Sequence, residues 1–243
     1  MTGNTSMAAR LLIGTAGWSI AARYADDFPD AGSHLARYAG RLGAVEINSS
    51  FHKPHQRKTY ERWAESVPPD FRFAVKIPKT ITHDGGLADD GPLLDRFAGE
   101  VTGLGAKLAV LLVQLPPKLA FDAACWDDFL GALRARIDAD VALEPRHASW
   151  FSPEVDGLLR DQRVARVAAD PVRHGGEAPG GWDGLAYYRW HGAPRIYYSD
   201  YDSVALARIR QRLDASLAAG SATWCIFDNT AASAALGNAL ALL

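Results

Sequence analysis

The stretch LAVLLVQLPPKLAFDAACWDDFLGALRARIDADVALEPRH, residues 108–147, contains the repeating unit that decides the fold. It begins with an apolar run at 108–116, continues with helical apolar spacing near 122–137, and ends with a second apolar run at 141–147. Two adjacent strands joined by a helix of this length must run parallel, because a parallel pair needs a long crossover connection. The stretch therefore predicts a strand–helix–strand unit of a parallel sheet with helices outside.

The same alternation extends along the chain in both directions. Further strands are expected at 11–17, 44–48, 71–78, 164–170, 185–192 and 222–229, and further helices at 32–42, 56–66, 89–104, 153–160, 203–219 and at the C-terminal end. Eight strands and seven helices predict an α/β fold of the TIM (β/α)8 barrel type, in which the Gly/Pro-rich stretch at 174–184 replaces the helix between strands 6 and 7. An open doubly wound sheet is the alternative, but GTAGWS at 14–19 is not the GxGxxG fingerprint usual there.

Composition and charge restrict the classes of function. The 243 residues carry 26 Lys+Arg against 28 Asp+Glu, a net charge of −2, which argues against a general polyanion binder. Residues 1–9 are expected to form a flexible leader, and 10–243 a single barrel domain. The absence of a signal peptide or an apolar spanning segment predicts a cytoplasmic protein without a membrane partner. Cys125 and Cys225 are too far apart to suggest a zinc site or a disulfide framework.

Side chains able to bond or ionise gather where the predicted strands end. In a parallel barrel the active site lies at these carboxyl ends. Because charged residues between apolar neighbours are costly unless they are paired or line a cavity, we expect them to converge on one mouth. The residues are Trp18, Glu46, Asn48, Lys76, His83, Gln114, Glu144, Arg146, His147, Asp170, Arg189, His191, Asp228 and Asn229.

The fixed cations of this set predict an anionic ligand. Lys76, Arg146 and Arg189 would hold a phosphate or carboxylate group. Glu46, Glu144 and His191 would transfer protons, since charged neighbours can tune each of them. These roles predict a hydrolase or lyase acting on a small phosphate- or carboxylate-bearing substrate.

Two alternatives use nearly the same residues. A divalent metal could be held by Glu46, Glu144, Asp170 and His191, as in a metal-dependent phosphodiesterase acting on nucleic acid. No HExxH-like spacing supports such a site, three nearby cations oppose it, and the net charge disfavours nucleic acid, so no cofactor is predicted. The other alternative is a barrel that binds an anion without catalysis.

Several motifs in order resemble one known family. GTAGW at 14–18, FRFAVKIPKTITH at 71–83, QLPP at 114–117, ALEPRHASW at 142–150 and YYRWHG at 187–192 are similar to motifs of the domain-of-unknown-function 72 family, also called YecE-like. The resemblance spans about 11–241 and implies a TIM barrel, whose shape is similar to that of endonuclease-IV-like phosphodiesterases. It also implies a strand-end set, of which we assign to substrate binding Trp18, Asn48, Lys76, His83, Gln114, Arg146, His147, Arg189 and Asn229.

Two positions depart from the family pattern. Ile20 stands where the family carries aromatic residues, which thins an expected aromatic wall. Asp228 stands where the family carries an amide, and it could shift local pKa values or add a ligand to the alternative metal site.

Overall fold

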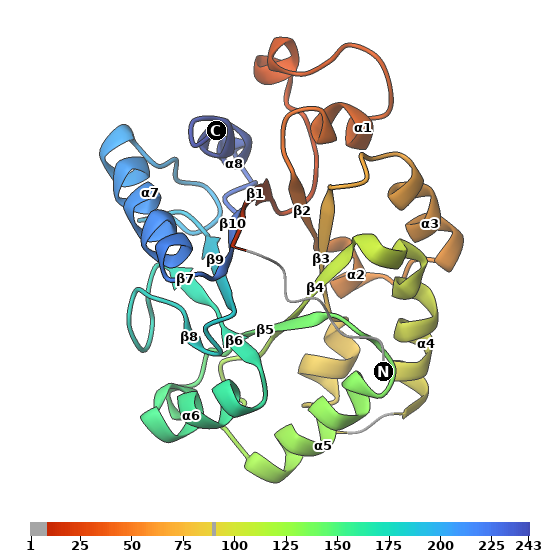
Figure 1. The fold of residues 1–243 in the computed structure, drawn as a ribbon, viewed down its shortest axis with the longest axis vertical. Coiled ribbons are helices and arrows are strands. Elements are labelled where there is room, and N and C mark those ends of the chain that lie inside the picture. Colours follow the sequence, from red (N-terminus) through yellow and green to blue (C-terminus); the bar gives the residue numbers. More distant parts are fainter. Residues whose placement is uncertain (1–8, 89–90) are drawn as a thin grey trace.

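The computed structural model describes residues 9–88 and 91–243. The predicted leader at 1–9 therefore lies, except for residue 9, outside the described residues. Strands and helices alternate along the chain, with the helices around the outside of the strands (Figure 1). The strands are β1 (Leu11–Thr15), β2 (Ala44–Ile47), β3 (Arg72–Lys76), β4 (Leu108–Gln114), β5 (Asp140–Glu144), β6 (Val164–Arg166), β7 (Ala168–Asp170), β8 (Gly180–Gly181), β9 (Leu185–Trp190) and β10 (Ala222–Phe227).

The helices follow the predicted order, and side-chain caps fix where several of them begin. Ser152 accepts a hydrogen bond from the Val155 amide at the start of α6, and Asp202 accepts one from the Ala205 amide at the start of α7. The α-helices are α1 (His34–Ala39), α2 (Ser49–His52), α3 (Arg57–Glu65), α4 (Gly91–Val101), α5 (Ala123–Arg134), α6 (Pro153–Asp161), α7 (Ser203–Ala218) and α8 (Ala234–Leu240). Short 3-10 or π turns lie at Ala22–Asp27, Thr80–Asp84, Thr102–Lys107 and Ala148–Phe151.

The strands form two sheets. One has the order β1-β10-β9-β7 and is entirely parallel. The other has the order β2-β3-β4-β5-β6-β8 and is parallel except for β8, which pairs antiparallel with β6. The protein is therefore a mixed α/β fold built on parallel sheets. A closed eight-stranded barrel is not confirmed, because the hydrogen-bond ladder does not close.

The ladder is interrupted at two places. The predicted sixth strand is divided at Val167: β6 pairs with β5 in one sheet, and β7 pairs with β9 in the other. Between β1 and β2 the backbone forms a single bridge, at Ala16 and Glu46. The two sheets are thus linked by one shared chain segment and one bridge.

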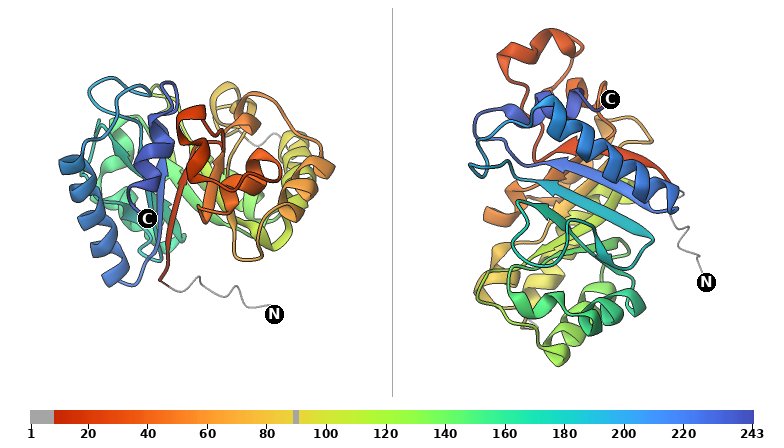
Figure 2. Two further views of the ribbon diagram at one scale, coloured as in Figure 1. Left: turned by 90° about the horizontal axis from the view of Figure 1, so that it is seen from above. Right: turned by 90° about the vertical axis from the view of Figure 1, so that its left-hand side faces the viewer.

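Strand side chains that face the space between the sheets form their own apolar cluster. Small residues on one side meet large aromatic residues on the other, and the rings of Tyr187 and Trp224 stack with centroids 5.7 Å apart. The period of two along a strand places the strand-end charges on the same face as this cluster, as Ala142 and Glu144 show on β5. A second, larger cluster packs the opposite strand faces against the helices, as for α7 beside β10 (Figure 2).

The connection from β7 to β9 contains no α-helix in residues 171–184, all of which the structure describes, as the Gly/Pro content predicts. The connection is held to the sheet by β8, which pairs with β6. There Gly181 has φ +67°, and an added Cβ would lie 2.5 Å from the Val164 carbonyl oxygen. Only glycine allows this close approach. The connection thereby runs past the ends of β6 and β7, beside the strand-end charges.

Candidate functional site

Five charged side chains from four strands meet between the carboxyl ends of the two sheets. We call this set the ionic cluster: Glu46, Glu144, Arg189, His191 and Asp228. Glu46 and Arg189 lie one residue before the end of their strands, Glu144 ends β5, and His191 and Asp228 directly follow β9 and β10. Their alternation along the strands places all five on the face of the interior apolar cluster. All five are buried.

Arg189 is the centre of the ionic cluster. Its side chain is 0% exposed, and its guanidinium binds Glu46 at two points, with Nη2 2.7 Å from Oε1 and Nε 3.1 Å from Oε2. The same guanidinium donates to Glu144 Oε2 at 2.5 Å and to Asp228 Oδ2 at 3.0 Å. The three carboxylates therefore engage every nitrogen of Arg189. That Arg189 holds a ligand anion stays a prediction; in the structure each of its nitrogens binds a carboxylate of the protein.

Glu144 also contacts two residues that do not belong to the ionic cluster. Gln114 donates to its Oε1 at 2.8 Å, and Arg146 Nη2 lies 3.3 Å from the same oxygen. Burial acts to raise the pKa of Glu144, but the charge of Arg189 and the hydrogen bond with His191 outweigh it and hold that pKa well below its usual range. Glu144 is consequently ionised near neutral pH.

His191 lies between two carboxylates. Its Nδ1 is 2.9 Å from Asp228 Oδ2, and its Nε2 is 3.5 Å from Glu144 Oε1. Burial acts to lower the pKa of His191, but the hydrogen bond with Asp228 and the nearby carboxylate of Glu144 outweigh it and raise the pKa above its ordinary value. This arrangement favours a proton on the imidazole.

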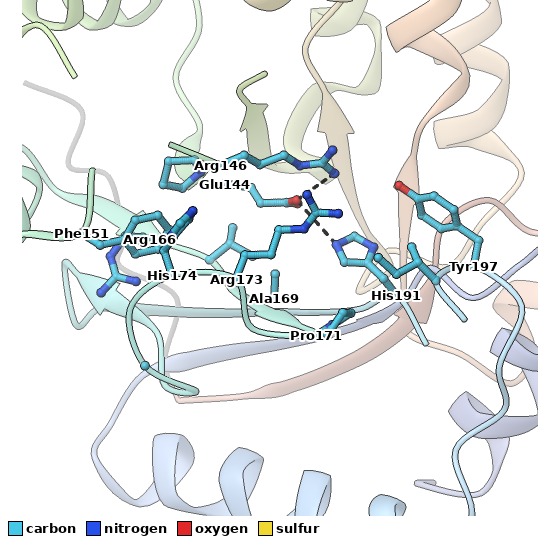
Figure 3. Close-up of a pocket in the computed structure, with 14 residues that line it drawn as sticks. Glu144, Arg146, Phe151, Arg166, Ala169, Pro171, Arg173, His174, His191 and Tyr197 are labelled. Carbon is cyan, nitrogen blue, oxygen red and sulfur yellow. Dashed lines mark hydrogen bonds and ion pairs between the residues drawn. The ribbon is translucent and has the colours of Figure 1, made fainter. Parts of the chain in front are cut away.

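A pocket of about 320 Å³ opens beside the ionic cluster, and we call it the strand-end pocket. Glu144 and His191 lie at its inner end, with Arg146 and Tyr197 on its sides (Figure 3). The β7–β9 connection adds Arg173 and His174 to the lining. Arg166 also contributes, but its guanidinium is paired with Asp156 at 2.7 and 2.9 Å.

Several other predicted site residues make structural contacts instead. Asn229 donates to the Ser199 carbonyl and to Asn238, so it anchors the segment after β9 to α8. Asp170 accepts the hydroxyl of Tyr201. His147 caps the turn at Ala148–Phe151 by accepting from the Ser149 amide.

The remaining predicted residues lie toward the β1–β3 side. Trp18 packs edge-on against Trp63 with centroids 5.0 Å apart. Asn48 follows β2, and its side-chain oxygen is buried without a hydrogen-bond partner among the described residues. Thr82 lies 2.9 Å from His83 Nδ1, and burial, reinforced by Lys76 and Arg146, lowers the pKa of His83. Lys76 is buried at the end of β3.

The carboxylates do not form a cation site in this arrangement. Glu46, Glu144 and Asp228 are all paired with the Arg189 guanidinium, and Asp170 accepts the hydroxyl of Tyr201. No group of three or more His, Cys, Asp or Glu in the described parts of the chain has a metal-binding arrangement. The residues present therefore do not fit the divalent metal of the alternative hypothesis.

Sequence reasoning missed part of the pocket lining. Arg173 lies in the β7–β9 connection, and Phe151 ends the 3-10 turn at Ala148–Phe151. Only the tertiary fold brings these two residues to the pocket that Glu144 lines. For Tyr197 the sequence did hold a signal: an aromatic residue in the Gly/Pro-containing segment that follows a predicted strand. Its ring lies edge-on to His191 with centroids 5.7 Å apart.

The fold and the site together define the class: an α/β protein of parallel sheets whose strand ends hold a buried cluster of charges beside an open pocket. The profile of the family described as "Protein of unknown function DUF72" matches residues 12–243. The chain belongs to the DUF72 family, which confirms the family predicted from its motifs.

Curated relatives match over part of their length. The UPF0759 protein YecE of Escherichia coli K12 is 29% identical over 120 residues, which cover 49% of this chain and 43% of YecE. The UPF0759 protein YunF of Bacillus subtilis 168 is 32% identical over 129 residues, covering 49% of this chain and 44% of YunF. Each match thus spans less than half of the relative.

Solved structures match over nearly the whole chain. A DUF72 family protein from Enterococcus faecalis V583 superposes with a TM-score of 0.80 at 20% identity, covering 96% of this chain and 94% of the other. A DUF72 family protein from Thermotoga maritima MSB8 superposes with a TM-score of 0.77 at 23% identity, covering 96% and 97%. These similarities establish the fold. Within the described residues, no helix has the length and apolar character needed to cross a membrane.

Proposed function

We propose that this protein is an enzyme, a hydrolase or lyase, that acts on a small phosphate- or carboxylate-bearing substrate in the strand-end pocket. The observation that carries the proposal is the unequal charge of that pocket. Arg146 and Arg173 line it, whereas Glu144, the carboxylate among its described lining residues, is already neutralised by Arg189. An anion entering the pocket would meet the guanidinium groups of Arg146 and Arg173, while the carboxylate of Glu144 is already paired with Arg189.

The proposed assignment of roles follows from position. Arg146 holds the anion, because its guanidinium lines the pocket and keeps only one long contact, at 3.3 Å, with Glu144. His191 supplies the proton, because its two carboxylate neighbours keep it protonated. Glu46 and Arg189 are positioning residues in this proposal, since both are fully buried and neither lines the pocket.

The proposed architecture behind this site is a barrel-like closure of the two sheets. The segment 164–170 pairs with both sheets, and Arg189 joins β9 to Glu46 on β2 and Glu144 on β5. A (β/α)8 barrel with an interrupted ladder is consistent with these links. It would explain why the polar side chains meet at one end.

A thermal-shift screen tests the anion site. We expect phosphorylated or carboxylated metabolites to raise the melting temperature, because a ligand that binds only the native state stabilises it. The shift should disappear in Arg146→Ala and persist in Arg195→Ala, a matched control, because Arg195 is exposed, stacks on Tyr198 and does not line the pocket. An equal loss of the shift in both variants would contradict the assignment.

The same screen separates the competing functions. With a substrate in hand, Glu144→Gln should abolish turnover while the circular-dichroism spectrum stays native. Tight anion binding without turnover in the wild type would favour a non-catalytic binding protein. A shift with Mn²⁺, Mg²⁺ or Zn²⁺ and none with any anion would favour the metal-dependent phosphodiesterase.

A further inference from the structure

Lys76 is a buried lysine whose ammonium has no hydrogen-bond or ion-pair partner among the residues that the structure describes. It is the last residue of β3, is 9% exposed, and shares the inward face of that strand with Ala74. Its ammonium lies 3.9 Å from the centroid of the Phe51 ring. Within 9–88 and 91–243, Lys76 Nζ forms no hydrogen bond or ion pair. The nitrogen itself is not fully buried and retains contact with solvent.

The surroundings of Lys76 lower its pKa and so raise the fraction of neutral amine near neutral pH. Burial lowers the pKa of Lys76 to about 8, and the charge of Arg189 adds to this effect. Three carboxylates oppose the lowering without touching the ammonium: Glu144, Glu46 and Asp228. His83, whose own pKa Lys76 lowers, lies edge-on to the same Phe51 ring with centroids 5.0 Å apart. With a pKa of about 8, roughly one molecule in ten carries the free amine at pH 7, against about one in 2,500 for an ordinary lysine.

The other five lysines of the chain differ from Lys76. Lys107 donates to the carbonyl oxygens of Ala64 and Val67 at 2.5 and 2.6 Å, which occupies its nitrogen. Lys79 is exposed and pairs with Asp84. Lys53, Lys58 and Lys118 are exposed. A buried amine without a protein partner, at the carboxyl end of a parallel strand, is therefore peculiar to Lys76.

We propose that Lys76 is a nucleophile that forms an imine with the carbonyl carbon of an aldehyde or 2-oxo acid. The lone pair of the neutral Nζ attacks the carbonyl carbon and forms a carbinolamine. The nitrogen gives up its two protons, the carbonyl oxygen takes up two and leaves as one water molecule, and a C=N bond remains. Neither an oxidant nor a reductant is required. The proposal rests on the proposed function to the extent that Arg146 would hold the carboxylate or phosphate of the same substrate, and it narrows the reaction class to lyase chemistry.

Reductive trapping tests Lys76 directly. Full-length protein is incubated at pH 7 with glyoxylate, which carries an aldehyde and a carboxylate, or with the neutral aldehyde propanal, and sodium cyanoborohydride reduces any imine to a stable secondary amine. Peptide mass spectrometry then measures modification at each of the six lysines. We expect Lys76 to be labelled at least about tenfold faster than Lys53, Lys58 or Lys118, as its larger fraction of neutral amine requires. Lys107 serves as the internal control for a lysine whose nitrogen is occupied.

Three outcomes distinguish the two proposals. Preferential labelling of Lys76 by glyoxylate that falls in Arg146→Ala, while propanal labelling persists, supports both the imine and the anion site. Preferential labelling by both probes that is unchanged in Arg146→Ala supports the imine and contradicts the role of Arg146. Labelling of Lys76 no faster than that of the exposed lysines overturns the imine proposal, even if anions still raise the melting temperature. Lys76→Arg, which keeps the charge, confirms the assignment of the labelled peptide.

Discussion

His191 shows how neighbours decide the chemistry of a single residue. As a strand-end histidine it could equally be neutral or charged, and its burial alone would favour the neutral form. Asp228 on one side and Glu144 on the other reverse that preference. Asp228, expected from the sequence to depart from the family pattern, is part of the ionic cluster, because its carboxylate contacts both His191 and Arg189.

This arrangement predicts a pH dependence of stability. Because the pKa of His191 is raised above 6.5, its charged contacts stabilise the fold fully below pH 6.5, and this stabilisation is lost as the pH rises through the folded-state value. We expect His191→Gln to lower the free energy of unfolding by about 1–3 kcal/mol below pH 6.5, and by less at higher pH. Urea denaturation at a series of pH values measures this difference. His174→Gln, at an exposed histidine, is the matched control and should change the free energy of unfolding little. A pH-independent loss in His191→Gln would refute the charged state.

At the scale of elements, the contact between β1 and β2 depends on the absence of a side chain. Gly14 on β1 lies so close to β2 that an added Cβ would be 2.2 Å from the Ala44 carbonyl oxygen. The Tyr38 hydroxyl donates to the same carbonyl at 2.9 Å and accepts from the Thr15 amide at 2.9 Å. This hydroxyl joins two strands that otherwise share a single backbone bridge.

Gly14→Ala is consequently expected to destabilise the protein by about 1–3 kcal/mol, as overpacking in a core does. Gly131→Ala is the matched control. Gly131 lies within α5, and an added Cβ there meets nothing within 4 Å, so this substitution should stabilise by about 1 kcal/mol through helix propensity. Denaturant unfolding of the two variants measures both effects, and equal stabilities would show that β1 can move away from β2 without cost.

At the scale of the whole molecule, the ionic cluster joins the two sheets. Arg189 belongs to the four-stranded sheet, whereas its partners Glu46 and Glu144 belong to the six-stranded sheet. Buried ion pairs stabilise a fold little compared with apolar packing, but removing one partner leaves buried charges uncompensated. The cluster therefore makes the relative position of the sheets dependent on one guanidinium.

Arg189→Met should lower the free energy of unfolding by about 3–5 kcal/mol, because three buried carboxylates lose their cation. Arg96→Met, which removes an exposed pair with Glu100 on α4, should cost less than about 1 kcal/mol. Chemical denaturation followed by tryptophan fluorescence and circular dichroism measures both variants. A loss in Arg189→Met no larger than in Arg96→Met would show that the cluster does not hold the sheets together.

The sequence by itself determined the order of strands and helices, the missing helix at 171–184 and the residues at the strand ends, because these depend on local periodicity and on glycine and proline. Only the tertiary structure decided which charges neutralise one another. Arg146 and Arg189 look alike in sequence, yet one lines the strand-end pocket and the other is enclosed by carboxylates. Pairing, burial and the division of the sixth strand at Val167 depend on contacts between residues far apart in the chain, which no local pattern encodes.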